Sequence, residues 1–179
     1  SSGYGGAFYI NNSSPVIEYN LIENNTAYYG NGSAFAMYNS SPLIRNNEIT
    51  GNPGSGTYNC IYVSGSSGSA RIINNVIAGN SGDAISCTAG TPDIINNTIS
   101  DNTSDAIFIG SASPDSIVNN ILTFNNGYGI YEGNSTKDAK IISYNLFYQN
   151  VSGLMYDENA TAYYNADDLN TGVSECEFN

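Results

Sequence analysis

The segment SPLIRNNEITGN, residues 41–52, decides the fold, because its pattern recurs along most of the chain. Asn47 and Asn52 stand five positions apart, Ile44 lies three positions before Asn47, and Ile49 lies two positions after it. The same spacing occurs in six asparagine pairs, which are Asn20 and Asn25, Asn47 and Asn52, Asn75 and Asn80, Asn97 and Asn102, Asn120 and Asn125, and Asn145 and Asn150. The chain therefore consists of internal repeats.

Each repeat also contains a third short apolar segment. Its apolar residues alternate, and they are Phe35/Met37, Ile61/Val63, Ile85/Cys87, Ile107/Ile109, Ile130 and Leu154/Tyr156. Three short strands per repeat, with no helical periodicity, cannot bury a core alone and must stack on neighbouring repeats. This predicts an all-β solenoid of about six coils plus a partial first coil.

The recurring asparagines have a predicted structural role in this solenoid. The first asparagine of each pair is expected at a corner between strands, where a left-handed backbone is useful, and the second is expected to end the next strand. Identical amide side chains stacked from coil to coil can hydrogen-bond to one another as a ladder. All twelve asparagines are predicted to belong to such ladders.

The repeat resembles that of the right-handed parallel β-helix proteins of the pectate-lyase-like superfamily. The resemblance rests on segments such as residues 41–52 and TPDIINNTISDN at residues 91–102, and it extends over about residues 7–156. It implies a right-handed parallel β-helix. It implies no single activity, because that superfamily includes lyases, hydrolases, epimerases, periplasmic carbohydrate-handling proteins and surface proteins.

The repeat register divides the chain into two parts. Residues 1–156 are predicted to form the coils, and residues 157–179 an acidic C-terminal extension or cap. Residues 7–10 align with residues 34–37, so the first strand is expected to lie inside a coil that has no N-terminal cap. An open coil exposes strand edges, so we expect either a fragment of a longer protein or a surface that another molecule covers.

Composition excludes several classes of function. Four Lys and Arg residues stand against 16 Asp and Glu, which gives a net charge of −12 and argues against nucleic-acid binding. The apolar runs are too short for membrane insertion. The chain has no histidine, which removes the commonest general base and the commonest transition-metal ligand.

The three cysteines leave at least one thiol free or paired with another chain. Strand alternation predicts that Cys87 points into the core and that Cys60 points outward. Cys60 and Cys176 are the candidates for a disulfide, within the chain or between chains, in a secreted or cell-surface protein.

Two carboxylates form a candidate site. Asp83 and Asp105 each lie three positions after the second asparagine of a pair, so they are predicted to stack in neighbouring coils. Two such carboxylates either share a proton or hold a cation such as calcium; the alternative is a pair of solvated turn residues. Glu132 aligns with inward positions but is expected to turn outward, because a lone buried carboxylate is costly.

No catalytic residue is assigned from the sequence. Arg45 and Arg71 are expected on a different sheet from Asp83 and Asp105, so no base is joined to a group that neutralises a substrate carboxylate. A non-enzymatic role is favoured. A hydrolase that uses two carboxylates stays open as the alternative.

The outward positions of the third strand predict a partly aromatic stripe. These positions are Tyr9, Ala36, Tyr62, Ser86, Phe108, Tyr131 and Met155. The aromatic members Tyr9, Tyr62, Phe108 and Tyr131 form a candidate face for a sugar or a protein partner. The alternative is the ordinary preference of aromatic residues for strands.

Together these observations favour a secreted or cell-surface structural β-solenoid. It is expected to associate with further copies edge to edge, in an envelope, sheath or filament structure. No cofactor is predicted except the candidate calcium. The alternative function is a polysaccharide-binding or polysaccharide-cleaving β-helix domain of a larger secreted enzyme.

Overall fold

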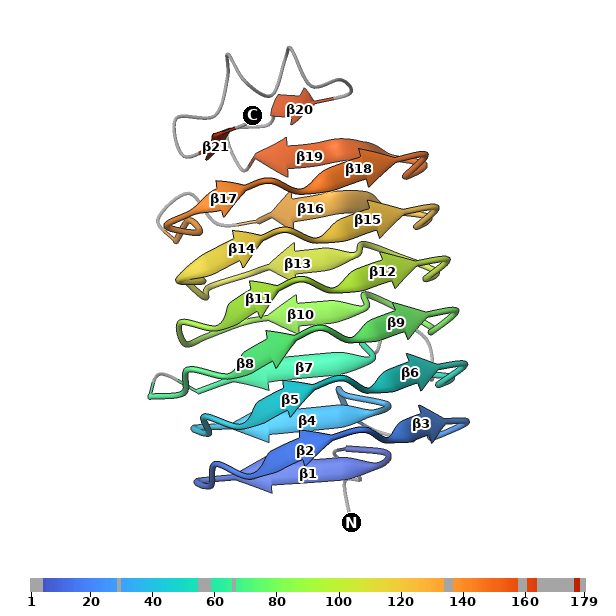
Figure 1. Ribbon diagram of the computed structural model, residues 1–179, viewed down its shortest axis with the longest axis vertical. Helices are drawn as coiled ribbons and strands as arrows, with labels where there is room; N and C mark the ends of the chain where they lie inside the picture. Colours follow the sequence, from blue (N-terminus) through green and yellow to red (C-terminus); the bar gives the residue numbers. More distant parts are fainter. Residues whose placement is uncertain are drawn as a thin grey trace.

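The protein is a solenoid of parallel β-strands in the computed structural model (Figure 1). The structure describes residues 5–28, 30–54, 59–65, 67–133, 137–157, 161–163 and 176–177. Every coil contributes one strand to each of three sheets, here named A, B and C, and neighbouring coils pair in register. The predicted all-β solenoid is confirmed.

Sheet A contains the third strand of each repeat and has eight strands. In spatial order they are β1 (Phe8–Asn11), β4 (Phe35–Tyr38), β7 (Ile61–Ser64), β10 (Ile85–Cys87), β13 (Ile107–Ile109), β16 (Tyr128–Glu132), β19 (Gly153–Asp157) and β20 (Thr161–Tyr163).

Sheets B and C contain the strands on either side of the first asparagine of each pair. Sheet B comprises β2 (Val16–Glu18), β5 (Leu43–Arg45), β8 (Arg71–Ile73), β11 (Asp93–Ile95), β14 (Ser116–Val118), β17 (Ile142–Ser143) and β21 (Cys176–Glu177). Sheet C comprises β3 (Leu21–Glu23), β6 (Glu48–Thr50), β9 (Val76–Ala78), β12 (Thr98–Ser100), β15 (Ile121–Thr123) and β18 (Leu146–Tyr148). Coil 1 is defined as β1 to β3, coil 2 as β4 to β6, and so on to coil 6, which is β16 to β18.

The core is a set of identical columns of apolar side chains. In sheet B the inward position is isoleucine in all six coils, and in sheet C it is isoleucine until Leu122 and Phe147 in the last two. Sheet A contributes two inward columns, and Phe8 stacks on Phe35 with ring centroids 4.9 Å apart. Each fully buried isoleucine contributes about 1.5–3 kcal/mol of hydrophobic stabilisation. Stacking therefore stabilises strands of only three or four residues.

The last coil of sheet A differs from the prediction by one position. Ile130 pairs with Met155 and Tyr131 with Tyr156, so Met155 points inward and is buried, whereas Tyr156 points outward. The expected inward pair Leu154/Tyr156 and the expected outward Met155 are wrong. Met155 stands five residues after Asn150, as Ile130 stands after Asn125, and this offset fixes the register.

Both asparagine positions carry hydrogen bonds from coil to coil. The backbone N–H and the Nδ2 of Asn97 both donate to Oδ1 of Asn120, at 2.9 and 3.1 Å, and its Nδ2 also donates to the carbonyl oxygen of Ile72 at 2.9 Å. The second position repeats this arrangement, since Asn102 donates to Asn125 in the same two ways. In coils 2 to 6 these amides are buried.

The left-handed residue at each corner is not the ladder asparagine but the residue before it. Asn96 has φ of 57° and precedes Asn97, and Asp101 has φ of 56° and precedes Asn102. The expectation that the first asparagine adopts this conformation is therefore wrong. The preceding residue turns the chain. The asparagine side chain then lies inside the solenoid, where it bonds to the asparagine of the next coil.

The C-terminal region adds strands to two of the sheets. β20 pairs antiparallel with β19, and β21 pairs parallel with β17. Tyr163 of β20 is buried and belongs to the core cluster that includes Met155. Sheet A thus ends in an antiparallel strand rather than in a free parallel edge.

Candidate functional site

The outer face of sheet A carries one aromatic side chain in almost every coil. Tyr9, Tyr38 and Tyr62 follow one another in coils 1 to 3, with ring centroids 5.6 and 5.8 Å apart. Phe108, Tyr131 and Tyr156 form a second row with centroid distances of 5.5 and 4.7 Å and nearly parallel rings. We call these two rows the aromatic face.

Small residues accommodate the rings of the aromatic face. A Cβ atom added at Gly110 would lie 3.0 Å from Cε1 of Phe108, and one added at Gly133 would lie 3.1 Å from Cε1 of Tyr131. In coil 2 the small residue and the ring exchange places. Ala36 is buried at the position where Tyr9 and Tyr62 stand in the neighbouring coils, and Tyr38, two residues later, supplies the ring. Phe108, Tyr131 and Tyr38 thus each have a small residue two positions away in their own coil.

Coil 4 interrupts the row. It has Ser86 at the outward position, and Thr88 two residues later donates from Oγ1 to the hydroxyl of Tyr62 at 3.0 Å. Ser86 is buried despite facing outward. The aromatic face thus consists of two separate blocks joined by a hydroxyl-lined coil.

The carboxylates Asp83 and Asp105 lie in neighbouring coils at the corner where sheet C turns into sheet A. The backbone N–H of Asp105 donates to Oδ1 of Asp83 at 3.3 Å, and that of Tyr128 donates to Oδ1 of Asp105 at 2.6 Å. Tyr128 also contacts Tyr131 and Tyr156, with centroid distances of 5.9 and 5.6 Å. We call Asp83 and Asp105 the acidic corner. Tyr128 connects this corner to the row formed by Phe108, Tyr131 and Tyr156.

Burial changes the acidity of this corner. Desolvation raises the pKa of Asp105 to about 6; the Tyr128 N–H opposes the shift and the Asp83 carboxylate adds to it. Burial also raises the pKa of Asp83, against hydrogen bonds from Ser104 and Asp105. Tyr131 has a raised pKa as well, through desolvation first and then through its neighbours Tyr156 and Asp105.

The calcium expected at this corner has no further ligand support. Within the part of the chain that the structure describes, no group of three or more His, Cys, Asp or Glu side chains is gathered. Oδ1 of each carboxylate accepts a backbone N–H. The corner is thus built as a hydrogen-bond site, and the structure does not support calcium.

Cys60 does not point outward as predicted. It is fully buried with a free thiol, at the corner where Ala34 and Ala84 occupy the neighbouring coils. Strand alternation fails here because the chain turns immediately before β7, which buries both Cys60 and Ile61. Cys87 is buried and free, as predicted for a core position. The side chain of Cys176 lies outside the described residues.

The prediction that Glu132 turns outward is also wrong. Glu132 continues β16 opposite Ile109 and is only 4 % exposed, so it does not turn outward. Its Oε1 accepts the backbone N–H of Ala139 at 3.3 Å, so this buried carboxylate binds the turn that leads to sheet B. The prediction missed this role because Ala139 is seven residues away in a turn without the repeat spacing.

Comparison with known proteins identifies the family. Residues 54–174, about two thirds of the chain, match the family described as NosD, periplasmic copper-binding protein. The chain belongs to the NosD family. It is therefore a parallel β-helix repeat protein of a periplasmic family, which agrees at that coarse level with the predicted location outside the cytoplasm. Searches of curated proteins and of solved structures found no match.

The side chains that the structure describes do not fit copper. The sequence has no histidine and only two methionines, Met37 and Met155, and both are buried. Met37 and Cys87 lie in one inward column but are separated by Val63, which places them about 10 Å apart. Burial raises the pKa of both Cys60 and Cys87 to about 12, which disfavours the thiolate that copper prefers. The described residues thus offer no copper ligand set.

Proposed function

We propose that this NosD-family protein is a non-catalytic envelope protein that binds a neutral glycan on the aromatic face of sheet A. The observation that carries the proposal is the pair of aromatic blocks around coil 4. They present phenolic hydroxyls, ring edges and the hydroxyl of Thr88 at the coil repeat of about 4.8 Å. Rows of half-buried aromatic side chains with polar tips are typical of surfaces that bind amphipathic ligands such as sugars.

Charge selects the class of glycan. The net charge of −12, together with Asp83 and Asp105 beside Tyr128, would repel uronates and sulfated sugars. A neutral polysaccharide running along the solenoid axis avoids this repulsion.

The test is affinity electrophoresis in gels that contain soluble neutral glucans or mannans. We expect retardation of the wild type, and a loss of affinity of about tenfold for Tyr131→Ser and Tyr62→Ser, since each removes an aromatic contact. The matched control is Tyr148→Ser, because this tyrosine is 52 % exposed on sheet C, away from the aromatic face. Equal mobility of the wild type with and without every glycan would refute the proposal, and release of reducing ends would replace binding with cleavage.

Edge-to-edge assembly is the second candidate function. β1, β2 and β3 are the outermost strands of their sheets in the described part of the chain, and a hollow of about 390 Å³ lies beside them, lined in part by Phe8, Leu21 and Ile22. Apolar strand edges of this kind template further parallel strands. The antiparallel β20 restricts such growth at the opposite end of sheet A.

Electron microscopy of the purified protein tests this assembly. Filaments that disappear in Leu21→Glu, which places a charge at the hollow, would support it. Dispersed single particles at all concentrations would reject it. Reductant should have no effect through Cys60, whose thiol is buried and free.

A further inference from the structure

One charged side chain lies on or just before the sheet B strand of each of coils 1 to 6. From the first coil to the sixth these are Glu18, Arg45, Arg71, Asp93, Asp115 and Lys140. They form three ion pairs between neighbouring coils, with N to O distances of 2.6 Å for Arg45–Glu18, 3.8 Å for Arg71–Asp93 and 2.5 Å for Lys140–Asp115. All six are partly exposed, so the pairs remain accessible from solvent.

The order of these charges is complementary to its own reverse. From coil 1 to coil 6 it runs acidic, basic, basic, acidic, acidic, basic. Read from coil 6 to coil 1, every sign is opposite. Two copies laid face to face in antiparallel orientation would therefore bring Arg71 opposite Asp93, which share one register position, on both sides of the two-fold axis. Two parallel copies would oppose like charges.

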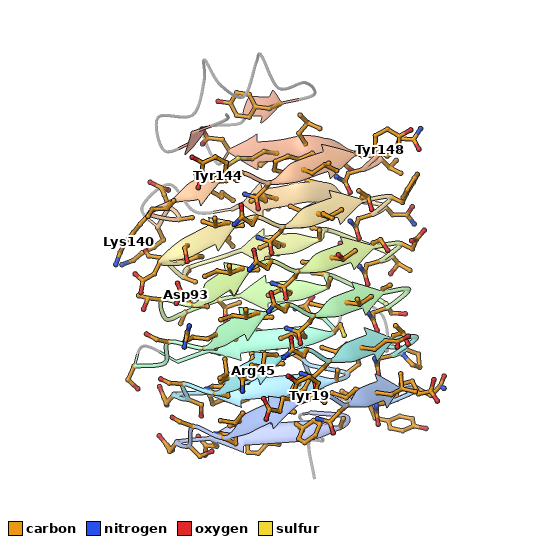
Figure 2. All side chains as sticks on the ribbon, viewed as in Figure 1. Tyr19, Arg45, Asp93, Lys140, Tyr144 and Tyr148 are labelled. Carbon is orange, nitrogen blue, oxygen red and sulfur yellow. The ribbon has the colours of Figure 1, made fainter. Side chains whose placement is uncertain are left out.

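Apolar side chains mark the two ends of the same surface. Coil 1 has Val16, Tyr19 and Leu21 where coil 6 has Ile141, Tyr144 and Leu146. All six are between 50 and 75 % exposed. Figure 2 shows the labelled Tyr19, Arg45, Asp93, Lys140 and Tyr144 along one side of the solenoid.

The coils between these ends are polar at the corner. The positions equivalent to Tyr19 and Tyr144 are Asn46, Asn74, Asn96 and Asn119, all with positive φ. Antiparallel pairing brings the apolar end of one copy onto the apolar end of the other and places the asparagines opposite each other. Exposed apolar groups rimmed by polar ones are typical of protein interfaces.

We propose that this face, sheet B with its corner to sheet C, binds a second copy of the chain in a two-fold symmetric, antiparallel dimer. Coil 1 lies over coil 6 of the second copy, and coil 3 lies over coil 4. Arg71 then faces Asp93 of the second copy, and the reverse contact forms by symmetry. This interface is independent of the glycan-binding aromatic face.

Charge reversal at the centre of the face tests both the surface and the orientation. Sedimentation equilibrium of the wild type should show a dimer. Arg71→Glu and Asp93→Arg should each weaken the dimer at least about tenfold, because each opposes like charges twice at the two-fold axis. When these two variants are mixed, the introduced glutamate faces the introduced arginine and Arg71 faces Asp93, so a heterodimer should form at wild-type affinity.

The mixing step separates the proposal from simple loss of the internal ion pair. The Arg71–Asp93 pair within one chain is absent from both variants, so recovery on mixing can come only from contacts between chains. Lys137→Glu is the matched control, because it changes the charge equally but lies in the turn before sheet B. Circular dichroism melting should show all variants folded, since an exposed pair contributes only about 0–1 kcal/mol.

Three results would overturn the proposal. They are a monomeric wild type up to millimolar concentration, a dimer that Arg71→Glu leaves unchanged, or variants that stay monomeric when mixed.

Discussion

Two kinds of corner hold this solenoid together, and they use their side chains in opposite ways. At the asparagine corners each amide donates to the next coil and accepts from the previous one, so the ladder continues through all six coils. At the acidic corner the carboxylates only accept, since Oδ1 of Asp83 and of Asp105 binds a backbone N–H of the following coil. A ladder of amides can extend through any number of coils, because each amide both donates and accepts. A ladder of carboxylates cannot, because it places like charges one above the other.

The corners differ in burial as well as in chemistry. Asn97 is 1 % exposed and neutral, so its burial adds no charge to the interior. Asp83 and Asp105 are only partly buried and still have raised pKa values, chiefly through desolvation. The amide corners therefore stabilise the fold at every pH, and the acidic corner makes stability depend on pH.

Breaking an amide ladder in its middle should have the largest effect. Asn97→Leu removes the acceptor for both donors of Asn75 and the donor for the carbonyl of Ile72, and all of these groups are buried. Because each unsatisfied buried group costs about 1–3 kcal/mol, we expect a loss of about 3–5 kcal/mol in the free energy of unfolding. Urea denaturation measures this loss.

The neighbouring Asn96 provides the control. It is exposed with φ of 57°, so Asn96→Gly keeps the left-handed turn and should change stability by less than about 0.5 kcal/mol. A loss in Asn97→Leu no larger than in this control would show that the ladder bonds do not stabilise the fold.

The acidic corner should give a smaller, pH-dependent effect. A native pKa of about 6 for Asp105, above its unfolded value, means that its contribution is fully present below about pH 4 and is lost as the pH rises through 6. Asp105→Asn can still accept the N–H of Tyr128 through its amide oxygen. We expect it to stabilise the protein at pH 7 by about 1 kcal/mol, after allowance for solvent screening, and to have little effect at pH 4.

Thermal melts of the two proteins across this pH range measure the difference. Asp115→Asn is a suitable comparison, because the Lys140 ammonium lowers the pKa of Asp115 and the pH dependence should have the opposite sign. Equal melting curves for wild type and Asp105→Asn at pH 7 would show that the ionised carboxylate of Asp105 does not destabilise the native protein.

The repeat spacing made most of the fold predictable. A constant offset of five between asparagines, with isoleucine at fixed distances, determines which residues point inward in sheets B and C. The errors lie where that periodicity ends. Cys60 is buried because a corner breaks strand alternation, and Met155 keeps the offset from Asn150 that Leu154 and Tyr156 do not.

The aromatic face was less predictable for a different reason. Tyr38 fills the aromatic row from two positions further along its strand, and Tyr128 reaches the row from the corner. In coil 2 the ring of Tyr38 stands beside the small Ala36, and in coil 5 the ring of Phe108 stands beside Gly110. The prediction aligned one residue position per coil. It therefore could not show that the ring of one coil comes from a different position than the ring of the next.

Metal removal should have the smallest effect and sharpens the difference between the corners. If Asp83 and Asp105 serve as acceptors for backbone N–H groups, a chelator should leave the melting temperature unchanged, and added calcium or copper should not raise it. A metal that bound only the native state at a hundred times its dissociation constant would add about 2.7 kcal/mol, which a melt would detect easily. An increase of the melting temperature with calcium that is absent in Asp105→Asn would show that the acidic corner binds calcium. A rise with copper would require ligands beyond the buried thiols of Cys60 and Cys87, which are too poorly ionised and too enclosed to bind it.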